Sequence, residues 1–536
     1  MKIAIRVDSS RAIGSGHLVR CKTLAERLQM RGAQVRFICR QHAGNLIHWL
    51  SRAEFPVTVL PASDESDSLE EDYAAWLGVP PALDAAQTIE ALSGQRPDWL
   101  IVDHYGIDRS WEQQLRPHVE RIFAIDDLAN RAHDCDLLLD QNANTDGERR
   151  YRSLVPDTCR LIVGPRYALL RPEYRTHRQT RPPQADIARQ VLVFFGSTDT
   201  HDMTGQTLAA LSEPEFSDVR VDVVVGATNP RREALERQAA ARPHTQTYLP
   251  RPHLADLMAK ADLAIGSGGT VSWERCCLGL PTLVVSVAEN QVSACQALEA
   301  EGAIAYLGAA STTSQEQMSS QFQKYFNESS LLKGLSLTAS LQVDGRGGDR
   351  VSEYLVPTPN QDLELRGAEE EDSMLYFDWA NDPSVRENSF NSEIISWKTH
   401  ENWFQSKLID PHCYLGVLEA NGLPVGQIRF DIEGESALIN YSLDRLVRGR
   451  RWSSHLLCLG AKLLSETKVK RLRAKVKREN AASRLALLRS GFQKVPIEPL
   501  NQPRNIDTFQ VLYSDIERFT PGNLASDNDK GRISLT

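Results

Sequence analysis

The 536-residue sequence predicts an α/β protein in which two lobes with parallel sheets precede a smaller α+β domain. Short, continuous apolar runs ending at an acidic residue or a glycine recur through the first 290 residues or so, and such runs are typical of strands covered by helices on both faces. Beyond a proline-containing polar stretch, residues 356–362, the pattern changes to shorter amphipathic segments and a hairpin signal.

The first lobe is expected at residues 1–165. Ile3–Val7 is an apolar run, and a glycine-bearing loop leads from it into apolar positions at helical spacing that stop near Gly32. Further buried strands are expected at Val35–Cys39, Trp99–Val102, Ile122–Ile125 and Leu137–Leu139.

The second lobe is expected at residues 166–350. Its predicted strands are Val191–Phe195, Val221–Val225, Leu263–Ile265 and Leu283–Val287, and glycine follows the first three. Because open α/β sheets bind ligands at the carboxyl ends of their strands, the loops after these strands and those of the first lobe are predicted to face a shared cleft.

Residues 351–361 are predicted to be a linker and residues 362–516 a third domain. Asn421–Gly422 lies between two apolar runs and predicts a hairpin; helices are expected from about Ser453 and from Asn480. The polar tail, residues 517–536, is predicted to be disordered.

Composition narrows the function classes. A net charge of −9 argues against nucleic acid or a membrane surface as the partner. Nine cysteines without a CxxC or Cys/His ligand spacing are expected to be reduced, mostly buried thiols. The opening MKIAIRVDSS has no apolar core of signal-peptide length, and no apolar run reaches membrane-spanning length, so we expect a cytoplasmic enzyme.

The first candidate site is the segment Gly14–Arg20, at the junction between the first predicted strand and the helix that follows it. Gly14 and Gly16 allow close backbone approach to a ligand, and His17 is suited to proton transfer near neutral pH. Asp103 and Tyr105 follow a neighbouring strand and are suitable partners for sugar hydroxyls. The alternative is that the glycines only form a tight turn and that the histidine and acids cap helices.

The second candidate site lies in the other lobe. Gly268, Gly269 and Thr270 form a glycine turn before a helix, as in diphosphate cradles, and Glu274 one turn later is placed to accept ribose hydroxyls. Asn290 and Gln291 follow the next strand and offer uncharged amides. A Walker lysine and a GxGxxG at the first strand are both missing, which argues against an ATPase and a dinucleotide oxidoreductase.

Seven segments together carry a specific resemblance over residues 1 to about 345. They are RVDSSRAIGSGHLVRCKTLAERL, DHYGID, AIDDLANRAHDCDLLLDQN, GPRYALLRPEY, FFGSTD, GSGGTVSWERCCLGLP and AENQ. In this order they closely resemble the UDP-2,4-diacetamido-2,4,6-trideoxy-β-L-altropyranose hydrolases of bacterial pseudaminic acid biosynthesis. The resemblance implies a GT-B fold of two Rossmann-like lobes, with the UDP-sugar between them.

The same resemblance implies a mechanism. Water attacks the anomeric carbon with inversion, His17 is the general base, and the Gly268–Thr270 turn receives the diphosphate without a metal or other cofactor. Arg6, Asp8, Tyr105 and Asn290 are further expected sugar or phosphate contacts.

The third domain resembles the GNAT acetyltransferases that act on nucleotide-linked amino sugars. WANDPSVR at 379–386, HENWF at 400–404, PVGQI at 424–428 and VRGRRWSSHLL at 447–457 carry this resemblance, with Asn480, Ser483 and Gly491–Phe492. It implies acetyl-CoA as cosubstrate and a pyrophosphate site at Arg448, Gly449, Arg450, Arg451 and Ser453, with Asn480 as a further CoA contact.

Two departures from the GNAT pattern stand out. Arg451 and Ser453 occupy places where small glycines are expected, and Leu487 replaces the usual tyrosine acid. Thiolate protonation then needs another donor or water.

The resulting hypothesis is a bifunctional enzyme whose ligands are a UDP-amino sugar and acetyl-CoA. N4-acetylation of the precursor UDP-sugar comes immediately before UDP removal in the pathway that the resemblance indicates. The alternatives are a GT-B glycosyltransferase using a related UDP-amino sugar and a nucleotide-sugar-binding protein with an inactive GNAT domain. The sugar's stereochemistry and the oligomeric state stay open at this point.

Overall fold

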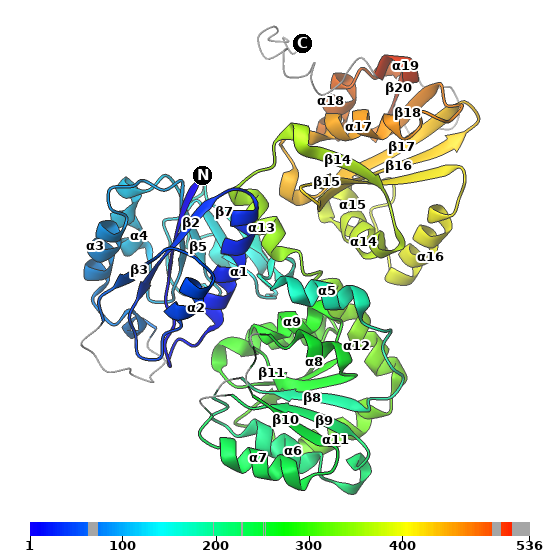
Figure 1. The fold of residues 1–536 in the computed structure, drawn as a ribbon. Helices are drawn as coiled ribbons and strands as arrows, with labels where there is room; N and C mark the ends of the chain where they lie inside the picture. The colour runs from blue at the N-terminus through cyan, green and yellow to red at the C-terminus, as the bar shows by residue number, and fades with distance from the viewer. Residues whose placement is uncertain are drawn as a thin grey trace. The chain divides into compact units, whose positions relative to one another are not determined.

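The computed structural model describes residues 1–62, 73–196, 198–226, 229–249, 251, 253–495 and 505–516. The chain divides into two compact units, an N-terminal unit of Met1–Val356 and a C-terminal unit that begins at Pro357 (Figure 1). The predicted tail, residues 517–536, lies outside the described residues.

The N-terminal unit starts with a lobe built on a seven-stranded parallel sheet of order β3-β2-β1-β4-β5-β6-β7. The chain builds outward from β1 in one direction and then resumes at β4 on the other side of β1, so β1 and β4 form a topological switch point. The strands are β1 (Lys2–Val7), β2 (Gln34–Arg40), β3 (Val57–Leu60), β4 (Trp99–Asp103), β5 (Ile122–Ile125), β6 (Leu137–Asp140) and β7 (Arg160–Val163).

Helices cover both faces of this sheet, as the continuous apolar strands require. The apolar repeat predicted after the first strand forms α1, whose Leu18, Leu24 and Leu28 are fully buried in the core on one face. Trp111 and Leu115 of α4 belong to the core on the other face. The helices of this lobe are α1 (Gly16–Met30), α2 (Ile47–Arg52), α3 (Pro81–Ala91) and α4 (Arg109–Leu115).

The second lobe repeats the same topology with a six-stranded parallel sheet of order β10-β9-β8-β11-β12-β13. Its switch point lies between β8 and β11. The strands are β8 (Gln190–Phe194), β9 (Arg220–Val224), β10 (Thr245–Tyr248), β11 (Leu263–Ser267), β12 (Thr282–Ser286) and β13 (Ala305–Ala309). These two sheets confirm the predicted pair of Rossmann-like lobes.

Two apolar cores lie on opposite faces of the second sheet. Helices α8, α9 and α10 contribute to one core and α6, α7 and α11 to the other (Figure 1). The helices are α5 (Pro172–Thr180), α6 (Met203–Ala210), α7 (Arg232–Ala241), α8 (Ala255–Lys260), α9 (Val271–Cys277), α10 (Val292–Ala300), α11 (Gln315–Phe326) and α12 (Ser329–Gln342).

The last helix of the unit, α13 (Gly347–Leu355), returns to the first lobe and lies beside α1 (Figure 1). Val351 and Leu355 are fully buried in the first lobe's core. Glu353 pairs with Arg31 at 2.6 Å. The predicted linker, residues 351–361, is therefore helical at its first five residues, and they complete a core that starts at residue 3.

The C-terminal unit has a mixed seven-stranded sheet of order β14-β15-β16-β17-β18-β20-β19. The predicted hairpin forms β15 and β16, with positive φ angles at Asn421 and Gly422 in its turn. The strands are β14 (Leu363–Gly367), β15 (Cys413–Ala420), β16 (Leu423–Glu433), β17 (Ser436–Leu443), β18 (Arg471–Lys477), β19 (Gln493–Val495) and β20 (Ile506–Leu512). The helices are α14 (Ser373–Asn381), α15 (Pro383–Asn388), α16 (Trp397–Leu408), α17 (Trp452–Lys462), α18 (Ala481–Arg489) and α19 (Tyr513–Ile516).

Strands β17 and β18 run in parallel but pair over only half of their lengths. Their ladder ends at Ile439 and Ala474, whereas β17 continues to Leu443 along β16 and β18 continues to Lys477 along β20. The sheet therefore forks after Ile439, and the last four residues of β17 leave one backbone edge without a ladder partner.

Candidate active sites

The first candidate site forms at the switch point of the first lobe. Strand register places Val7 beside Asp103, so the loop after β1 and the end of β4 share one edge of the sheet. His17 is the second residue of α1, directly after that loop. The sequence therefore brings His17 and Asp103 together through two neighbouring strand ends, although 86 residues separate them.

His17 and Asp103 form a hydrogen-bonded pair. His17 Nδ1 lies 2.6 Å from Asp103 Oδ1, and a carboxylate accepts only from a protonated nitrogen, so Nδ1 carries the hydrogen. The 3.1 Å approach of Arg20 Nη2 to Nδ1 is then a close contact rather than a hydrogen bond, because both groups are donors. In the neutral ring the lone pair is on Nε2, which has no hydrogen-bond partner among the described residues.

Arg20 fixes the carboxylate that orients His17. Its Nε and Nη2 donate to the two oxygens of Asp103 at 2.7 and 2.6 Å, which is the bidentate geometry of a strong ion pair. Burial alone would raise the pKa of Asp103, but Arg20 and His17 hold it well below its usual range. The group facing His17 is therefore an ionised carboxylate near neutral pH.

Tyr105 lines the same site from the loop after β4. Its ring meets the His17 ring edge-on with centroids 4.6 Å apart, and its hydroxyl donates to Asp127 at 2.5 Å. Arg20 also reaches Asp127, at 3.1 Å. Burial and the Asp127 carboxylate raise the pKa of Tyr105 well above its usual value, so the phenol keeps its proton.

The placement of Asp103 differs from the expected sugar contact. The side chain is fully buried, and its oxygens accept from His17, Arg20 and Cys21, so it positions the histidine. The register of β1 and β4 explains this burial, because it places Asp103 at the strand end beside α1, where His17 and Arg20 lie.

Arg6 and Asp8 also lie away from solvent. Arg6 donates to Asp8 at 2.6 Å and to Asp84 at 2.7 Å, and all three side chains are fully buried. Arg40 adds a second cation on Asp84 at 2.7 Å. This buried ionic network holds α3 against β1 and β2. It accounts for both residues without a ligand, and their contact with sugar or phosphate stays a prediction that this burial does not favour.

Gly14 and Gly16 have different reasons to be glycine. Gly14 has a φ of +76°, which side chains other than glycine rarely adopt, and its N–H donates to Ser10 O at 2.9 Å to close the turn. Gly16 has an ordinary φ, and no heavy atom lies within 4 Å of where a Cβ would stand. Beside His17 there is thus open space for a ligand to approach the Gly16 backbone.

The second lobe contributes the loop between β11 and α9. A Cβ on Gly268 would lie 2.3 Å from Cys295 Sγ, so packing alone requires glycine there, whereas Gly269 meets only Gln291 Nε2 at 3.7 Å. Thr270 is exposed. Gln291 Oε1 accepts from the Val287 N–H at 3.0 Å and is engaged in its own loop, and Asn290 is exposed.

Glu274 lies in the first turn of α9, half-buried beside Tyr174. Burial raises the pKa of Glu274 to about 7, and the Tyr174 hydroxyl counteracts part of that rise. Tyr174 is itself buried and accepts the Leu254 N–H at 3.3 Å. A carboxylate that is costly to ionise in the free protein gains from hydroxyl donors, which is what a ribose supplies.

In the C-terminal unit the predicted CoA segment lies between β17 and α17. Arg451 has a φ of +62° and Gly449 a φ of +85°, so the backbone does require left-handed residues here although one of them is an arginine. Arg448 donates to Leu443 O at 3.1 Å and pairs with Asp382 at 2.9 Å. The guanidinium of Arg450 lies 5.2 Å from the Trp452 ring centre, and Ser453 is half-buried in the first turn of α17.

Asn480 and Leu487 have structural positions on α18. Asn480 caps the helix, because its Oδ1 accepts the Ser483 N–H at 3.0 Å. Leu487 is fully buried. A contact between Asn480 and CoA stays a prediction.

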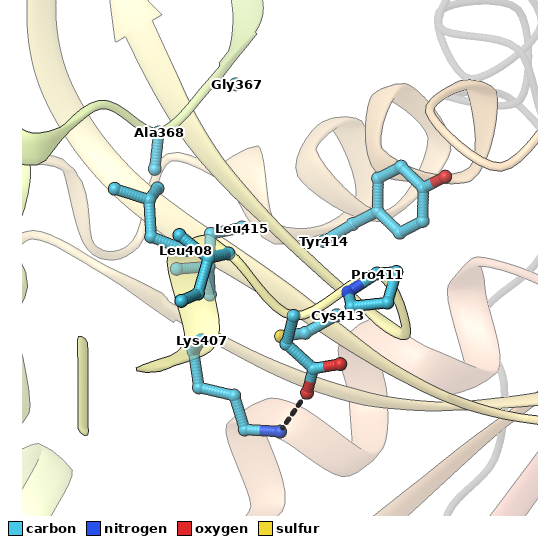
Figure 2. Close-up of a pocket in the computed structure, with 10 residues that line it drawn as sticks. Gly367, Ala368, Lys407, Leu408, Pro411, Cys413, Tyr414 and Leu415 are labelled. Carbon is cyan, nitrogen blue, oxygen red and sulfur yellow. Dashed lines mark hydrogen bonds and ion pairs between the residues drawn. The ribbon is translucent and has the colours of Figure 1, made fainter. Parts of the chain in front are cut away.

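A pocket of about 350 Å³ lies elsewhere in this unit, between the end of α16 and strands β14 and β15 (Figure 2). Lys407 on its rim forms ion pairs with Asp410 and Asp431 at 3.0 and 3.1 Å. Cys413 and Leu415 line it as well. None of the residues predicted to bind acetyl-CoA lines this pocket.

Sequence reasoning missed Arg20 and Tyr174. The signal for Arg20 is its spacing of three from His17 at the start of a helix, which puts both side chains on one face. Tyr174 belongs to the quoted GPRYALLRPEY segment, but only the fold brings it to Glu274.

The nine cysteines are all free thiols, eight of them buried. In the described part of the chain, no group of three or more His, Cys, Asp or Glu side chains has an arrangement that would hold a metal ion. Nor is any described helix both long and apolar enough to cross a membrane.

Comparison with known proteins supports both resemblances. The chain is 24% identical over 366 residues to the spore coat polysaccharide biosynthesis protein SpsG of Bacillus subtilis. This alignment covers 68% of the present chain and all of SpsG. It is 26% identical over 304 residues to the UDP-2,4-diacetamido-2,4,6-trideoxy-beta-L-altropyranose hydrolase of Campylobacter jejuni. This alignment covers 56% of the present chain and 97% of the hydrolase.

Among solved structures, MurG of Acinetobacter baumannii aligns with a TM-score of 0.46 and 16% identity, covering 66% of this chain and 99% of that one. Residues 362–493 match the family described as the acetyltransferase (GNAT) domain. The chain thus joins an N-terminal unit of two parallel-sheet lobes, similar in sequence to a UDP-2,4-diacetamido-2,4,6-trideoxy-beta-L-altropyranose hydrolase, to a C-terminal region whose residues 362–493 match the acetyltransferase (GNAT) domain family.

Proposed function

We propose that the N-terminal unit hydrolyses a UDP-linked 2,4-diacetamido-2,4,6-trideoxy hexose at C1 with inversion, releasing UDP and the free sugar. The observation that carries this proposal is the His17–Asp103 pair, in which Nδ1 is engaged and Nε2 has no hydrogen-bond partner among the described residues, beside an open glycine loop. Similarity to the Campylobacter hydrolase supports the substrate class.

In this reaction His17 acts as the general base. Nε2 takes a proton from water, the water oxygen bonds to C1, and the bond from C1 to the diphosphate oxygen breaks with its electrons leaving on UDP. The Asp103 carboxylate stabilises the imidazolium that forms, and Arg20 keeps that carboxylate in place. Every group in this relay is held by at least one hydrogen bond before substrate arrives.

The second lobe is proposed to bind the UDP part. The backbone of the Gly268–Thr270 turn binds the diphosphate, and Glu274 accepts hydrogen bonds from the ribose hydroxyls. Asn290 and Gln291 lie after the neighbouring strand β12 and complete the proposed set. We propose that no metal takes part, so chelator leaves the rate unchanged.

The test is UDP release from the acetylated UDP-sugar by the full-length chain. His17→Ala is expected to lower kcat by about 10²–10⁴-fold, because a general base contributes that much, while the Kd for UDP stays within twofold. His48→Ala is the matched control, since His48 is an exposed histidine of the same lobe. Well-folded protein that releases no UDP, with or without added divalent metal, contradicts the hydrolase. A sugar conjugate formed with an added acceptor, in place of free sugar, favours a glycosyltransferase.

We further infer that the GNAT domain transfers an acetyl group from acetyl-CoA to the 4-amino group of the precursor UDP-sugar. The family match at residues 362–493 and the left-handed loop before α17 support acetyl-CoA as cosubstrate. The amide product is then the substrate proposed for the N-terminal unit, so one chain would carry two consecutive steps.

A one-pot assay separates the two activities. The 4-amino UDP-sugar with acetyl-CoA should yield CoA thiol, UDP and the free diacetamido sugar by mass spectrometry. The His17→Ala chain should accumulate the acetylated UDP-sugar instead. Absence of CoA thiol from the wild-type chain contradicts the acetyl transfer and leaves the hydrolase proposal standing.

A further inference from the structure

Acetyl transfer to an amine expels CoA as a thiolate, and a thiolate leaves more readily when it is protonated. The position at which GNAT resemblance places a tyrosine acid is Leu487, which is fully buried and has no proton to give. The proton donor therefore has to come from another element.

Tyr441 lies at the fork of the sheet. It is on β17 two residues beyond Ile439, where β18 has already separated from β17. Its cross-strand partner is Ile428, and a Cβ on Gly460 of α17 would lie 2.6 Å from Ile428 Cδ1. Since opposite residues share a face, Tyr441 lies on the face covered by α17.

The hydroxyl of Tyr441 reaches the first turn of α18. It lies 3.5 Å from the carbonyl oxygen of Ser483, a long hydrogen bond in which the phenol donates. Ser483 and Leu487 are four residues apart and so lie on one side of α18. Strand β17 thus places the Tyr441 phenol about one helical turn from Leu487, the position on α18 where the GNAT pattern has a tyrosine.

The phenol is suited to give a proton at neutral pH. Burial raises the pKa of Tyr441 to about 12, so the hydroxyl is protonated in the free protein. The 3.5 Å bond to Ser483 is at the weak end of hydrogen-bond distances, so little is lost when the hydroxyl turns to another acceptor.

We propose that Tyr441 is the proton donor to the departing CoA thiolate, an inference that rests on the proposed acetyltransferase function. The neutral amine nitrogen bonds to the thioester carbonyl carbon, and the carbon–sulfur bond then breaks as the carbonyl re-forms. Sulfur takes the proton of the Tyr441 hydroxyl. The proton released from the new ammonium nitrogen returns through water to the phenolate, so amine and acetyl-CoA become amide and CoA thiol.

The experiment measures CoA thiol release by the full-length chain with acetyl-CoA and the 4-amino UDP-sugar. Tyr441→Phe is expected to lower kcat by about 10²-fold, with the KM and Kd for acetyl-CoA within twofold. Tyr414→Phe is the matched control, because Tyr414 is an exposed tyrosine of the same sheet. A kcat within twofold of wild type overturns the proposal, as does a Kd for acetyl-CoA that rises by the factor by which kcat falls.

A second variant keeps the shape of the side chain. Replacing Tyr441 alone by 3,5-difluorotyrosine, a more acidic phenol, is expected to move the alkaline limb of the kcat–pH profile to lower pH. An unmoved alkaline limb overturns the proposal. A wild-type chain that releases no CoA thiol contradicts the proposed acetyl transfer itself, whereas thiol release with an unaffected Tyr441→Phe chain contradicts the role of Tyr441 alone.

Discussion

Individual side chains in the first site act through their partners. The two oxygens of Asp103 accept hydrogen bonds from three residues, His17, Arg20 and Cys21. Arg20 is itself only 5% exposed. A buried carboxylate and a buried guanidinium stabilise one another only as a pair. The orientation of His17 and the stability of the lobe therefore depend on the same contact.

Asp103→Asn tests this dependence. The substitution leaves the buried Arg20 with one carboxylate, Asp127 at 3.1 Å, in place of two, so the free energy of unfolding should fall by about 3 kcal/mol. UDP release should slow as well, because the amide no longer stabilises an imidazolium. Urea unfolding and steady-state kinetics measure both effects. In Glu120→Gln, which breaks an exposed pair with Arg96, the change should stay below about 0.5 kcal/mol; equal losses in the two variants would contradict the argument.

Glu274→Gln tests the half-buried carboxylate of the second lobe. Its pKa is raised from 4.5 to about 7, so its contribution to stability is full below pH 4.5 and is lost as the pH rises through 7. The variant should melt at the wild-type temperature at pH 5 and at a higher temperature at pH 8. UDP affinity should show the reverse, rising with pH in wild type and staying low and flat in the variant.

Thermal melting and calorimetric UDP titration at pH 5, 6, 7 and 8 check this. Glu316→Gln, an exposed acid in the first turn of α11, serves as control and should change neither quantity. A melting difference that is the same at every pH would show that ionisation of Glu274 is not its cause.

At the scale of elements, the backbone before α17 combines two left-handed positions. Glycine tolerates such a φ without steric cost, whereas a residue with a Cβ pays about 1–2 kcal/mol. Arg451 therefore carries strain that Gly449 does not. The loop that is expected to approach the CoA pyrophosphate thus holds one of its two left-handed turns at an energetic cost.

Gly449→Ala should accordingly destabilise the start of α17 by about 1 kcal/mol, and Arg451→Asn should leave it unchanged or more stable, since asparagine enters the left-handed region more readily. Hydrogen exchange at the backbone amides of α17 in the full-length chain measures the local opening free energy. Faster exchange in Arg451→Asn than in Gly449→Ala would contradict this account of the loop.

Elements with strong local signals could be predicted from the sequence. The strands that became β1, β4, β8 and β11 are continuous apolar runs, and Asn421–Gly422 gives the hairpin. The edge strands β3 and β10 were not predicted, because they are four residues each and mostly half-buried, so their residues carry no continuous apolar pattern. The fork between β17 and β18 could not be predicted either, because it depends on where two ladders end.

The candidate sites show the same division. His17, Gly14 and Glu274 follow from local motifs, since a glycine turn before a helix is visible in sequence. The roles of Asp103, Arg6 and Tyr441 depend on strand register, which decides whether a side chain faces solvent, a salt bridge or a helix. A polar residue at a strand end is thus a reliable pointer to an edge of the sheet but not to its own partner.

For the N-terminal unit as a whole, the first lobe is not a continuous piece of chain. Leu355 is fully buried in its core, and the indole N–H of Trp99 donates to Leu355 O at 3.3 Å. Leu355→Ala should therefore lower the free energy of unfolding of the N-terminal unit by about 3 kcal/mol. Thermal inactivation of the proposed UDP release should move to lower temperature, while the acetyl transfer proposed for the other unit keeps its wild-type profile. An unchanged inactivation temperature would contradict the role of α13 in this core.

The return of α13 also sets an order of assembly during synthesis. The first lobe emerges from the ribosome before the second, yet Val351 and Leu355, which close its core, are made only after the whole second lobe. Domains generally fold as units once their sequence is complete. The lobe that carries His17 is therefore the later of the two to finish folding, and the nascent chain holds a complete second lobe, with the proposed UDP site, before the His17–Asp103 pair has its finished core beneath it.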